Sequence, residues 1–270
     1  MVRWRFHILT FVAALPLLLG GAPPPAEMPA DFRAALAPAP GGQVVTVTDG
    51  DTLTLAGGLE IRLVGIQAPK LPLGRAGFEA WPLSQEAKAF LEVLTVGKTL
   101  TLGHGGRRGD RHGRALAHLF DAEGRWIQGQ ILKAGLARVY SFADNRALVA
   151  EMLALEGAAR AARRGIWGDP FYAVRTPDAA ARWLGGFEVV EGRVLAVGRG
   201  GGKTYLNFAD DWRSDFTIML DRKAQKLFEA AGLDLDSYAG RAVRVRGWLK
   251  SRNGPMIEAT HPEQIERLED

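Results

Sequence analysis

The chain has 270 residues, 47% of them hydrophobic, which is enough for more than one packed core. It contains no cysteine, which excludes disulfide frameworks, thiolate nucleophiles and zinc sites with cysteine ligands. The formal net charge is +4 and would fall to about +2 without Arg3 and Arg5 near the N-terminus, so global charge does not by itself identify an anionic partner.

The N-terminal segment has the anatomy of a signal peptide. Arg3 and Arg5 precede an apolar run over 8–19, and small residues and Pro23 follow it. We therefore expect residues 1–22 to be removed on export, which makes the protein periplasmic or secreted. An uncleaved anchor is the alternative, but the run is shorter than the about 20 residues that span a bilayer, so no stable membrane insertion is expected. The Pro- and Ala-rich residues 23–42 are expected to form a flexible tether.

The pattern from residue 43 onward predicts a small β-barrel with helices. Apolar residues alternate in short runs between 43 and 66, and an Asp-Gly turn signal separates the first two runs. Short strands joined by tight turns are typical of closed barrels. The further elements expected in this domain, residues 43–169, are a helix that is capped by Ser84 and stopped by Gly97, strands at 99–102 and 115–120, and helices at 127–134 and 147–164.

A second β segment, residues 187–270, is expected after a linker at 170–186, where proline and paired glycines interrupt the pattern. Its five predicted short strands suit an OB-like barrel. The turn at 199–203 is superficially similar to a phosphate loop, but its glycine spacing is one residue short and a strand pattern follows, so a hairpin turn is expected. The chain is thus predicted to be mainly β with appended helices: an OB-type five-stranded barrel with three helices, followed by a second small OB-like barrel.

Aromatic and cationic side chains are mixed in this second segment. On an OB-like barrel such side chains form grooves for single-stranded nucleic acid, whereas packing in the core is the alternative role of the aromatics. Acidic residues at 210, 211 and 215 interrupt the cationic run, so the sequence favours core packing. The aromatics are Tyr205, Phe208, Trp212, Phe216 and Trp248, and the cations are Lys203, Arg213, Arg244, Arg246 and Lys250.

Three blocks in the first β segment resemble the signature of the thermonuclease family, whose members are similar to staphylococcal nuclease. They are Asp-Gly-Asp-Thr at 49–52, Arg-Leu-Val-Gly-Ile-Gln-Ala-Pro-Lys at 62–70 and Asp-Arg-His-Gly-Arg-Ala-Leu-Ala at 110–117. Ala-Gly-Leu-Ala at 134–137 and Gly-Ile-Trp at 165–167 resemble two structural landmarks of that family. One such block alone would be weak evidence for this family, but five blocks in the order of the family are specific evidence.

The resemblance implies a calcium-dependent nuclease that hydrolyses phosphodiester bonds of DNA and RNA on an OB-type barrel. In such a reaction a cation neutralises the phosphate, a base deprotonates water, and arginine forks hold the transition state. Asp51 matches the first metal-binding aspartate of the family. Arg62 and Arg114 match its catalytic, phosphate-binding arginines.

Three positions depart from the family pattern. Gln67 stands where the family has a second metal aspartate, Ala68 where it has a threonine that offers its carbonyl, and Lys70 where it has the glutamate base. Gln67 keeps an amide oxygen that calcium accepts, but Lys70 repels a divalent ion by on the order of 5 kcal/mol at about 6 Å and an effective dielectric near 20. Calcium binding is therefore expected to be weak, and hydrolysis weak or lost. The three positions lie beside Pro69 in a loop after a strand, so their side chains are expected to face solvent.

The retained cations predict a phosphate site that needs no metal. Arg62, Lys70 and Arg114 are its expected ligands for nucleic acid, together with Arg111 from the cationic run at 107–114.

Three function classes remain open at the level of the sequence. The first is a protein that binds nucleic acid or phosphate with weak or no hydrolysis. The second is an active calcium-dependent nuclease with a substitute base, for which Asp49, Glu60 and Glu79 are candidates. The third is an envelope interaction or structural module. Calcium-dependent cleavage separates the second class from the others, and salt-sensitive oligonucleotide binding separates the first from the third.

Overall fold

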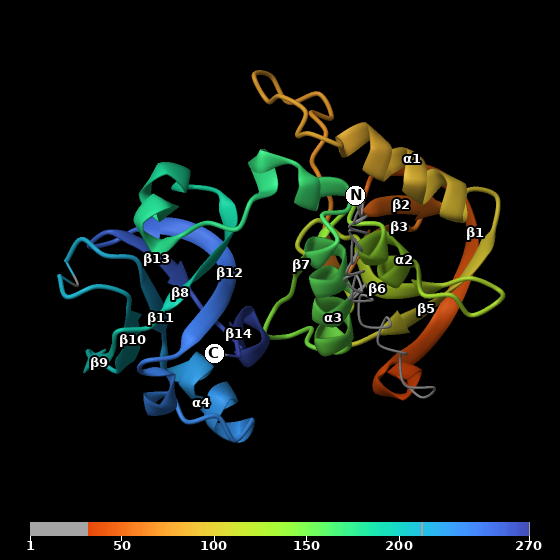
Figure 1. Cartoon of the computed structure of the whole chain (residues 1–270). Coiled ribbons are helices and arrows are strands. Elements are labelled where there is room, and N and C mark those ends of the chain that lie inside the picture. Colours follow the sequence, from red (N-terminus) through yellow and green to blue (C-terminus); the bar gives the residue numbers. More distant parts are fainter. Residues whose placement is uncertain (1–31, 212, 270) are drawn as a thin grey trace, which may run out of the picture.

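The computed structural model describes residues 32–211 and 213–269, which form two β domains (Figure 1). The signal peptide predicted for 1–22, the predicted tether up to residue 31, and Trp212 lie outside the described residues. Within the described ranges, no helix is both long and apolar enough to cross a membrane.

The first domain is built on a closed five-stranded barrel, which confirms the predicted fold. Its strands are β1 (Ala37–Asp49), β2 (Thr52–Leu55), β3 (Glu60–Leu63), β5 (Thr99–His104) and β6 (Ala115–Phe120). They are hydrogen-bonded in the order β1-β2-β3-β6-β5 and closed by β5 on β1, and β3 and β6 run parallel. Alternate side chains such as Leu53, Ile61 and Leu100 fill the interior with no exposed surface.

The strand β1 begins earlier than the sequence predicts. Residues 37–42, which their Pro and Ala content assigns to the tether, pair with β5, and Ala37 lies opposite His104. This half of β1 pairs with β5 alone, because β2 joins the strand only at Val44. Proline is tolerated there since its missing N–H can face the open edge. The tether prediction is therefore wrong for 37–42, and a 3-10 helix, Phe32–Ala35, precedes the strand.

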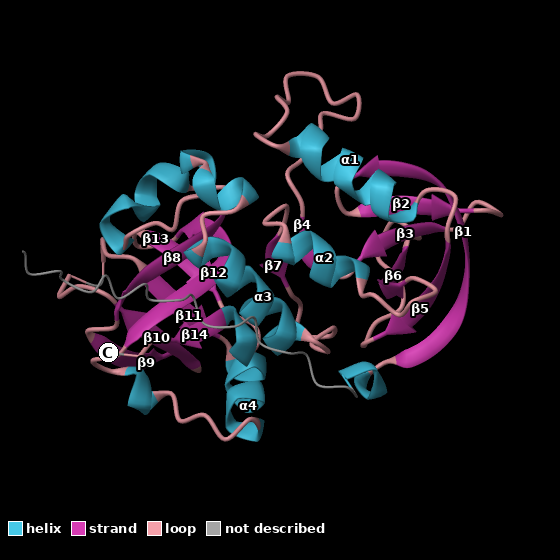
Figure 2. Cartoon of the chain, turned by 45° about the vertical axis from the view of Figure 1, so that its right-hand side comes forward, coloured by secondary structure: helices cyan, strands magenta, loops and turns pink. Residues whose placement is uncertain are grey.

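The three predicted helices are present on the outside of the barrel (Figure 2): α1 (Ser84–Thr95), α2 (Ile127–Lys133) and α3 (Val149–Ala161). Helix α1 packs on β1, and α2 packs on α3. The predicted cap is wrong in detail. The cap position is Leu83, with a left-handed φ of 61°, and Ser84 is already the first helical residue.

A two-stranded sheet outside the barrel contains part of the sequence block 62–70. Strand β4 (Gly65–Gln67) pairs antiparallel with β7 (Arg138–Tyr140). Gly65 has a φ of 83°, and a Cβ there would lie 2.4 Å from the methyl carbon of Met152. The positive φ therefore favours glycine at this position, and a Cβ would also displace the flexible end of the Met152 side chain.

The second domain repeats the topology of the first, and the predicted OB-like barrel is confirmed. The hydrogen-bonded path runs β9-β10-β11-β13-β12, with β8 on β12. Only Val194 and Leu195 separate β8 from β9, so these two strands act as halves of one bent strand. Because β8 pairs with β12 and β9 pairs with β10, the hydrogen-bonded path closes on itself. The turn between β9 and β10 is the expected hairpin, with positive φ at Gly201 and Gly202. The strands are β8 (Phe187–Arg193), β9 (Ala196–Gly200), β10 (Lys203–Asn207), β11 (Thr217–Leu220), β12 (Ala242–Ser251), β13 (Pro255–Glu258) and β14 (Ile265–Arg267).

The prediction from the sequence omits the helix α4 (Arg222–Ala230) between β11 and β12. The carboxylate of Asp221 caps it by accepting a hydrogen bond from the backbone N–H of Ala224 at 2.8 Å. Its mostly polar sequence buries Ala224 and Phe228. Ala224, Leu227 and Phe228 fall at helical spacing, so the helix could have been predicted from this pattern.

A buried ion pair joins the two domains. Arg246 of β12 is 1% exposed, and its Nη1 lies 2.9 Å from both carboxylate oxygens of Glu156 in α3. Its Nη2 contacts Glu266 within the second domain. The Glu156 carboxylate, also fully buried, accepts a hydrogen bond from Val139 N–H at 2.5 Å. One carboxylate thus holds α3, β7 and β12 together.

Two further polar contacts cross the domain interface, one partly exposed and one buried. Arg146 forms a bidentate ion pair with Glu263, with a shortest distance of 2.7 Å. The hydroxyl of Ser141 lies 2.7 Å from Nε2 of His261. Burial lowers the pKa of His261 to about 4, so its ring is neutral in this contact at neutral pH. The interface therefore combines a charged centre with neutral and half-exposed polar contacts.

Replacement of Arg246 by alanine should lower the free energy of unfolding by roughly 3–5 kcal/mol, because it removes the cation that the second domain supplies to a buried carboxylate. Arg146→Ala removes a partly exposed interdomain pair instead and should cost about 1 kcal/mol or less. Chemical denaturation followed by circular dichroism measures both changes. Equal losses in the two variants would contradict the role given to the buried pair.

Candidate functional site

The tight turn between β1 and β2 places two carboxylates inside the first domain. Asp51 is fully buried and Asp49 nearly so, and the backbone N–H of Asp51 donates to Asp49 Oδ1 at 3.1 Å. Gly50 separates them. A Cβ at this position would lie 2.6 Å from the Cβ of Ala68 and 2.8 Å from that of Ala87 in α1. The close packing therefore requires glycine, and the turn directs Asp51 toward the segment after β4.

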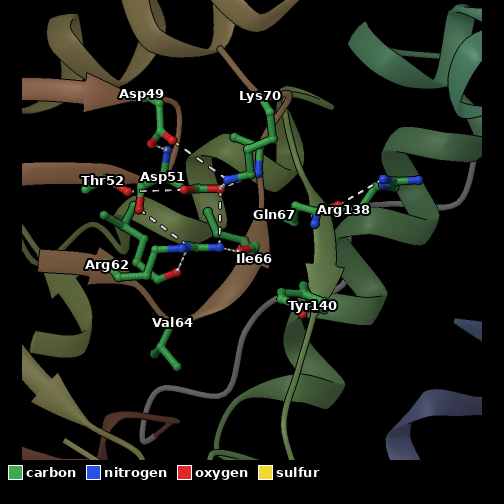
Figure 3. Close-up of polar contacts among 12 residues, drawn as sticks. Asp49, Asp51, Thr52, Arg62, Val64, Ile66, Gln67, Lys70, Arg138 and Tyr140 are labelled. Atoms are coloured by element: carbon green, nitrogen blue, oxygen red, sulfur yellow. Dashed lines mark hydrogen bonds and ion pairs between the residues drawn. The ribbon is translucent and has the colours of Figure 1, made fainter. Parts of the chain in front are cut away.

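Cationic and N–H groups surround the carboxylate of Asp51 (Figure 3). Its Oδ2 lies 2.7 Å from Lys70 Nζ and 3.3 Å from Arg62 Nη2, and it accepts a hydrogen bond from Ala68 N–H at 2.7 Å. Its Oδ1 lies 3.3 Å from the donating hydroxyl of Thr52. Burial alone raises the pKa of Asp51, but the charges of Arg62 and Lys70 and these hydrogen bonds outweigh burial and lower the pKa well below its usual range. The carboxylate therefore remains ionised.

The ammonium group of Lys70 lies between two carboxylates. It is 2.7 Å from Asp51 Oδ2 and 3.8 Å from Asp49 Oδ2. Burial raises the pKa of Asp49, and the neighbouring charge of Asp51 raises it further, while Lys70 and Arg62 act in the opposite direction. Lys70 thus occupies the place where a bound cation would contact this pair of carboxylates.

The donor set around Asp51 does not fit calcium, the cofactor that the sequence resemblance implies. Calcium takes about six to eight oxygen ligands, whereas both oxygens of Asp51 already receive N–H or O–H donors. The second expected ligand, Gln67, turns away, and its Oε1 accepts a hydrogen bond from Arg138 Nη2 at 2.9 Å. Across residues 32–211 and 213–269, no group of three or more His, Cys, Asp or Glu side chains is placed to hold a metal ion.

Gln67 serves a buried guanidinium instead. Arg138 lies under the rings of Phe187, Tyr172 and Trp81, with its Cζ 5.1, 5.5 and 5.9 Å from their centroids. Burial lowers the pKa of Arg138. The amide oxygen of Gln67 satisfies one of its N–H donors with a neutral acceptor.

The side chains of Gln67, Ala68 and Lys70, which depart from the family pattern, are expected from the sequence to face solvent. This expectation is wrong for Gln67 and Ala68. Gln67 is 5% exposed and Ala68 is 1% exposed, and only Lys70 reaches the surface in part. Gln67 belongs to β4, which pairs with β7. Ala68 packs beside Gly50 and α1, where a larger side chain has little room.

A pocket of about 450 Å³ opens beside Arg62. Four arginines line it, Arg62, Arg107, Arg111 and Arg114, so the two arginines singled out by the sequence blocks share one cavity. The pocket wall also includes Asp110, whose Oδ2 lies 2.7 Å from Arg114 Nη2 and orients that guanidinium. The predicted ligands Arg62, Arg111 and Arg114 are thus brought together. The predicted ligand Lys70 points at Asp51 instead and is outside this pocket wall.

The guanidinium of Arg62 is fixed from several sides. Its Nη1 donates to the carbonyl of Leu63 at 2.5 Å, and its Nη2 donates to the carbonyl of Ile66 at 2.6 Å. The ion pair to Asp51 adds a third contact. Little side-chain entropy is therefore left to lose when an anion binds at this wall.

Two aromatic side chains complete the pocket. Tyr140 and Phe142 line it, with ring centroids 4.7 Å apart. The Tyr140 ring also packs edge-on against Phe187 of the second domain at 4.8 Å, and its hydroxyl oxygen accepts a hydrogen bond from Trp248 Nε1 at 3.0 Å. The pocket therefore reaches the boundary between the domains.

Sequence reasoning missed Tyr140, Phe142 and the contact between Arg138 and Gln67. The alternation in the segment 138–142 is a strand signal that places positions 140 and 142 on one side, so these two could have been found. Trp248 is singled out by the sequence, but only as an aromatic of the second domain.

The candidate substitute bases are dispersed. Asp49 lies against Lys70 inside the domain. Glu60, at the start of β3, and Glu79, before α1, are exposed. The structure therefore brings one of the three acidic residues to the centre of the site.

Comparison with known proteins agrees with this geometry. A model of the family described as staphylococcal nuclease homologue matches residues 60–169. A protein named uncharacterized endonuclease, from Escherichia coli O157:H7, is 30% identical over 131 residues, which are 47% of this chain and 77% of that protein. Endonuclease YhcR of Bacillus subtilis (strain 168) is 29% identical over 183 residues, 64% of this chain and 14% of that protein. Protein ParB of Escherichia coli is 28% identical over 181 residues, 63% of this chain and 89% of that protein.

The barrel topology, the pairing of Arg62 and Arg114 in one pocket, and these matches agree on one assignment. The chain belongs to the family of staphylococcal nuclease homologues.

Proposed function

We propose that this protein binds nucleic acid through its arginine-lined pocket and hydrolyses phosphodiester bonds weakly or not at all, because Lys70 takes the place of the calcium ion. The observation that carries the proposal is the distance of 2.7 Å between Lys70 Nζ and Asp51 Oδ2. This contact supplies a positive charge from within the chain where the family's chemistry relies on a metal.

The pocket supports binding of a phosphodiester. Arg62 and Arg114 bring guanidinium groups to its wall, where Asp51 and Asp110 hold them, and Arg107 and Arg111 add positive charge at the same cavity. Because Arg62 is held by Asp51 and by backbone carbonyls, it is oriented before the ligand arrives. Such a site binds anions without a metal, and its affinity falls as salt rises.

The same geometry argues against fast hydrolysis. Lys70 stands in place of the family's base and cannot accept a proton in its charged form, and loss of a general base costs roughly 10²–10⁴-fold in rate. Asp49, the remaining carboxylate at this place, contacts Lys70 and accepts a hydrogen bond within its own turn. A weak or absent activity is the expected result.

Arg114→Ala should weaken binding of a short single-stranded oligonucleotide by about tenfold or more, because it removes one of the four guanidinium groups of the pocket. Binding should persist in a chelator and decrease with salt. Arg182→Ala, which removes an exposed arginine outside the pocket, is the matched control. Fluorescence anisotropy measures both. Affinity that requires calcium and is the same in wild type and Arg114→Ala would contradict the proposal.

Gln67→Asp combined with Lys70→Glu should raise calcium-dependent cleavage of DNA by at least about a hundredfold, since it restores a base and removes the internal cation. Ala68 is kept, because it is buried and any residue there offers a backbone carbonyl. Lys70→Gln, which removes the cation without adding a base, serves as the control and should stay near background.

The wild type should also be near background in this cleavage assay. Brisk calcium-dependent cleavage by the wild type would overturn the proposal. A double variant that folds and binds calcium yet remains inert would show that the loss of activity lies elsewhere in the site.

We also propose that the protein is exported with removal of residues 1–22, which is supported by the two arginines and the short apolar run that follows them. Mass spectrometry of the protein from the envelope fraction and the medium should find a chain that begins near Pro23. Intact Met1 on protein recovered from the cytosol would count against export.

A further inference from the structure

Four aromatic rings form a row that crosses from the first domain to the second. Phe142, Tyr140, Phe187 and Trp248 are neighbours in this order, with centroids 4.7, 4.8 and 6.2 Å apart. Phe187, the third ring of the row, is buried. Phe142 and Trp248, by contrast, are 45% and 44% exposed. Two large ring surfaces therefore remain open to solvent beside a cavity lined by arginines.

The hydrogen bond between Trp248 and Tyr140 ties the row to the pocket. The indole Nε1–H donates to the hydroxyl oxygen of Tyr140, which fixes the orientation of both rings. Because the Tyr140 oxygen is the acceptor in this bond, its own proton is free to be donated to another group. Tyr140 lines the pocket, so an anion bound there can receive that proton as a hydrogen bond.

Open rings next to a cationic pocket match the chemistry of single-stranded nucleic acid. Phosphates bind arginine, and unpaired bases stack on aromatic faces. Bases within a duplex are already paired and stacked, so they do not offer their faces to such a surface.

We propose that Trp248 of the second domain is a base-stacking residue that extends the binding site across the domain boundary and makes it selective for single-stranded nucleic acid. The inference rests on the proposed function, because it needs the phosphate next to the stacked base to bind at the arginine pocket. It assigns the second domain a direct part in holding the ligand.

A second cavity offers a competing path for the strand. It has a volume of about 420 Å³ and lies on the outer face of β9, β10, β11 and β13, where Tyr205, Asn207 and Arg252 line it. Its other cation, Arg199, is engaged by Asp236 at 2.8 Å. The wall of the arginine pocket holds four arginines and two aspartates, and the rival wall holds two arginines, so the row is favoured by its two exposed rings and not by charge.

The test compares a labelled oligothymidylate of about 12 nucleotides with an abasic strand of the same length, both followed by fluorescence anisotropy. Trp248→Ala should weaken binding of oligothymidylate on the order of tenfold and leave the abasic strand unchanged. Trp248→Phe keeps a ring and should stay within about threefold of wild type. Tyr205→Ala, in the rival cavity, should bind as the wild type does.

Tryptophan emission provides a readout that does not depend on the alanine variant. Oligothymidylate should quench wild-type emission more than it quenches that of Trp248→Phe, because the stacked indole is removed while the packing against Phe187 is largely kept. Equal quenching would overturn the proposal even if Trp248→Ala failed to fold.

The remaining outcomes separate this inference from the proposed function. If Arg114→Ala leaves both strands bound as in wild type, the arginine pocket is not the site and the proposed function fails. If Arg114→Ala weakens both strands while Trp248→Ala weakens neither, the stacking role alone is wrong. If Tyr205→Ala weakens binding of oligothymidylate while Trp248→Ala does not, the strand binds in the rival cavity.

Discussion

The negative charge of a fully buried carboxylate has to be balanced by cations or hydrogen-bond donors. The arrangement of the site follows from the groups that balance the charge of Asp51. The Asp-Gly-Asp turn directs the side chain inward, where water is excluded. Lys70, Arg62 and the N–H of Ala68 then supply the charge and the donors. Arg62 faces the pocket on its other side. One ion-pair cluster therefore keeps the barrel turn in place, holds the Lys70 ammonium against Asp51 and brings the Arg62 guanidinium to the wall of the pocket.

The second domain belongs to the same arrangement. The strand β7 carries Arg138, whose hydrogen bond holds Gln67 away from Asp51, and Tyr140, which lines the pocket. Both side chains contact Phe187 of the second domain. The interdomain ion pair on α3 and β12 fixes this contact. The relation between the domains thus bears on the shape of the arginine pocket as well as on stability.

The fold and part of the site could be predicted from the sequence, because they depend on local signals. Turn residues and alternating strands indicate both barrels, and ordered blocks bring Arg62 and Arg114 to one site. The direction of Gln67 could not be predicted, since it depends on Arg138, which lies 71 residues away. The same holds for the contact between Trp248 and Tyr140, 108 residues apart. Long-range packing of this kind leaves no periodic trace in a single sequence.

The claim that an internal lysine replaces the metal has a direct test in calorimetric titration of calcium into the wild type and into Asp51→Asn, each with and without a bound oligonucleotide. We expect calcium to give the same heat in the wild type and in Asp51→Asn, because the ammonium of Lys70 already contacts the Asp51 carboxylate. A saturable calcium isotherm in the wild type that disappears in Asp51→Asn would contradict this claim.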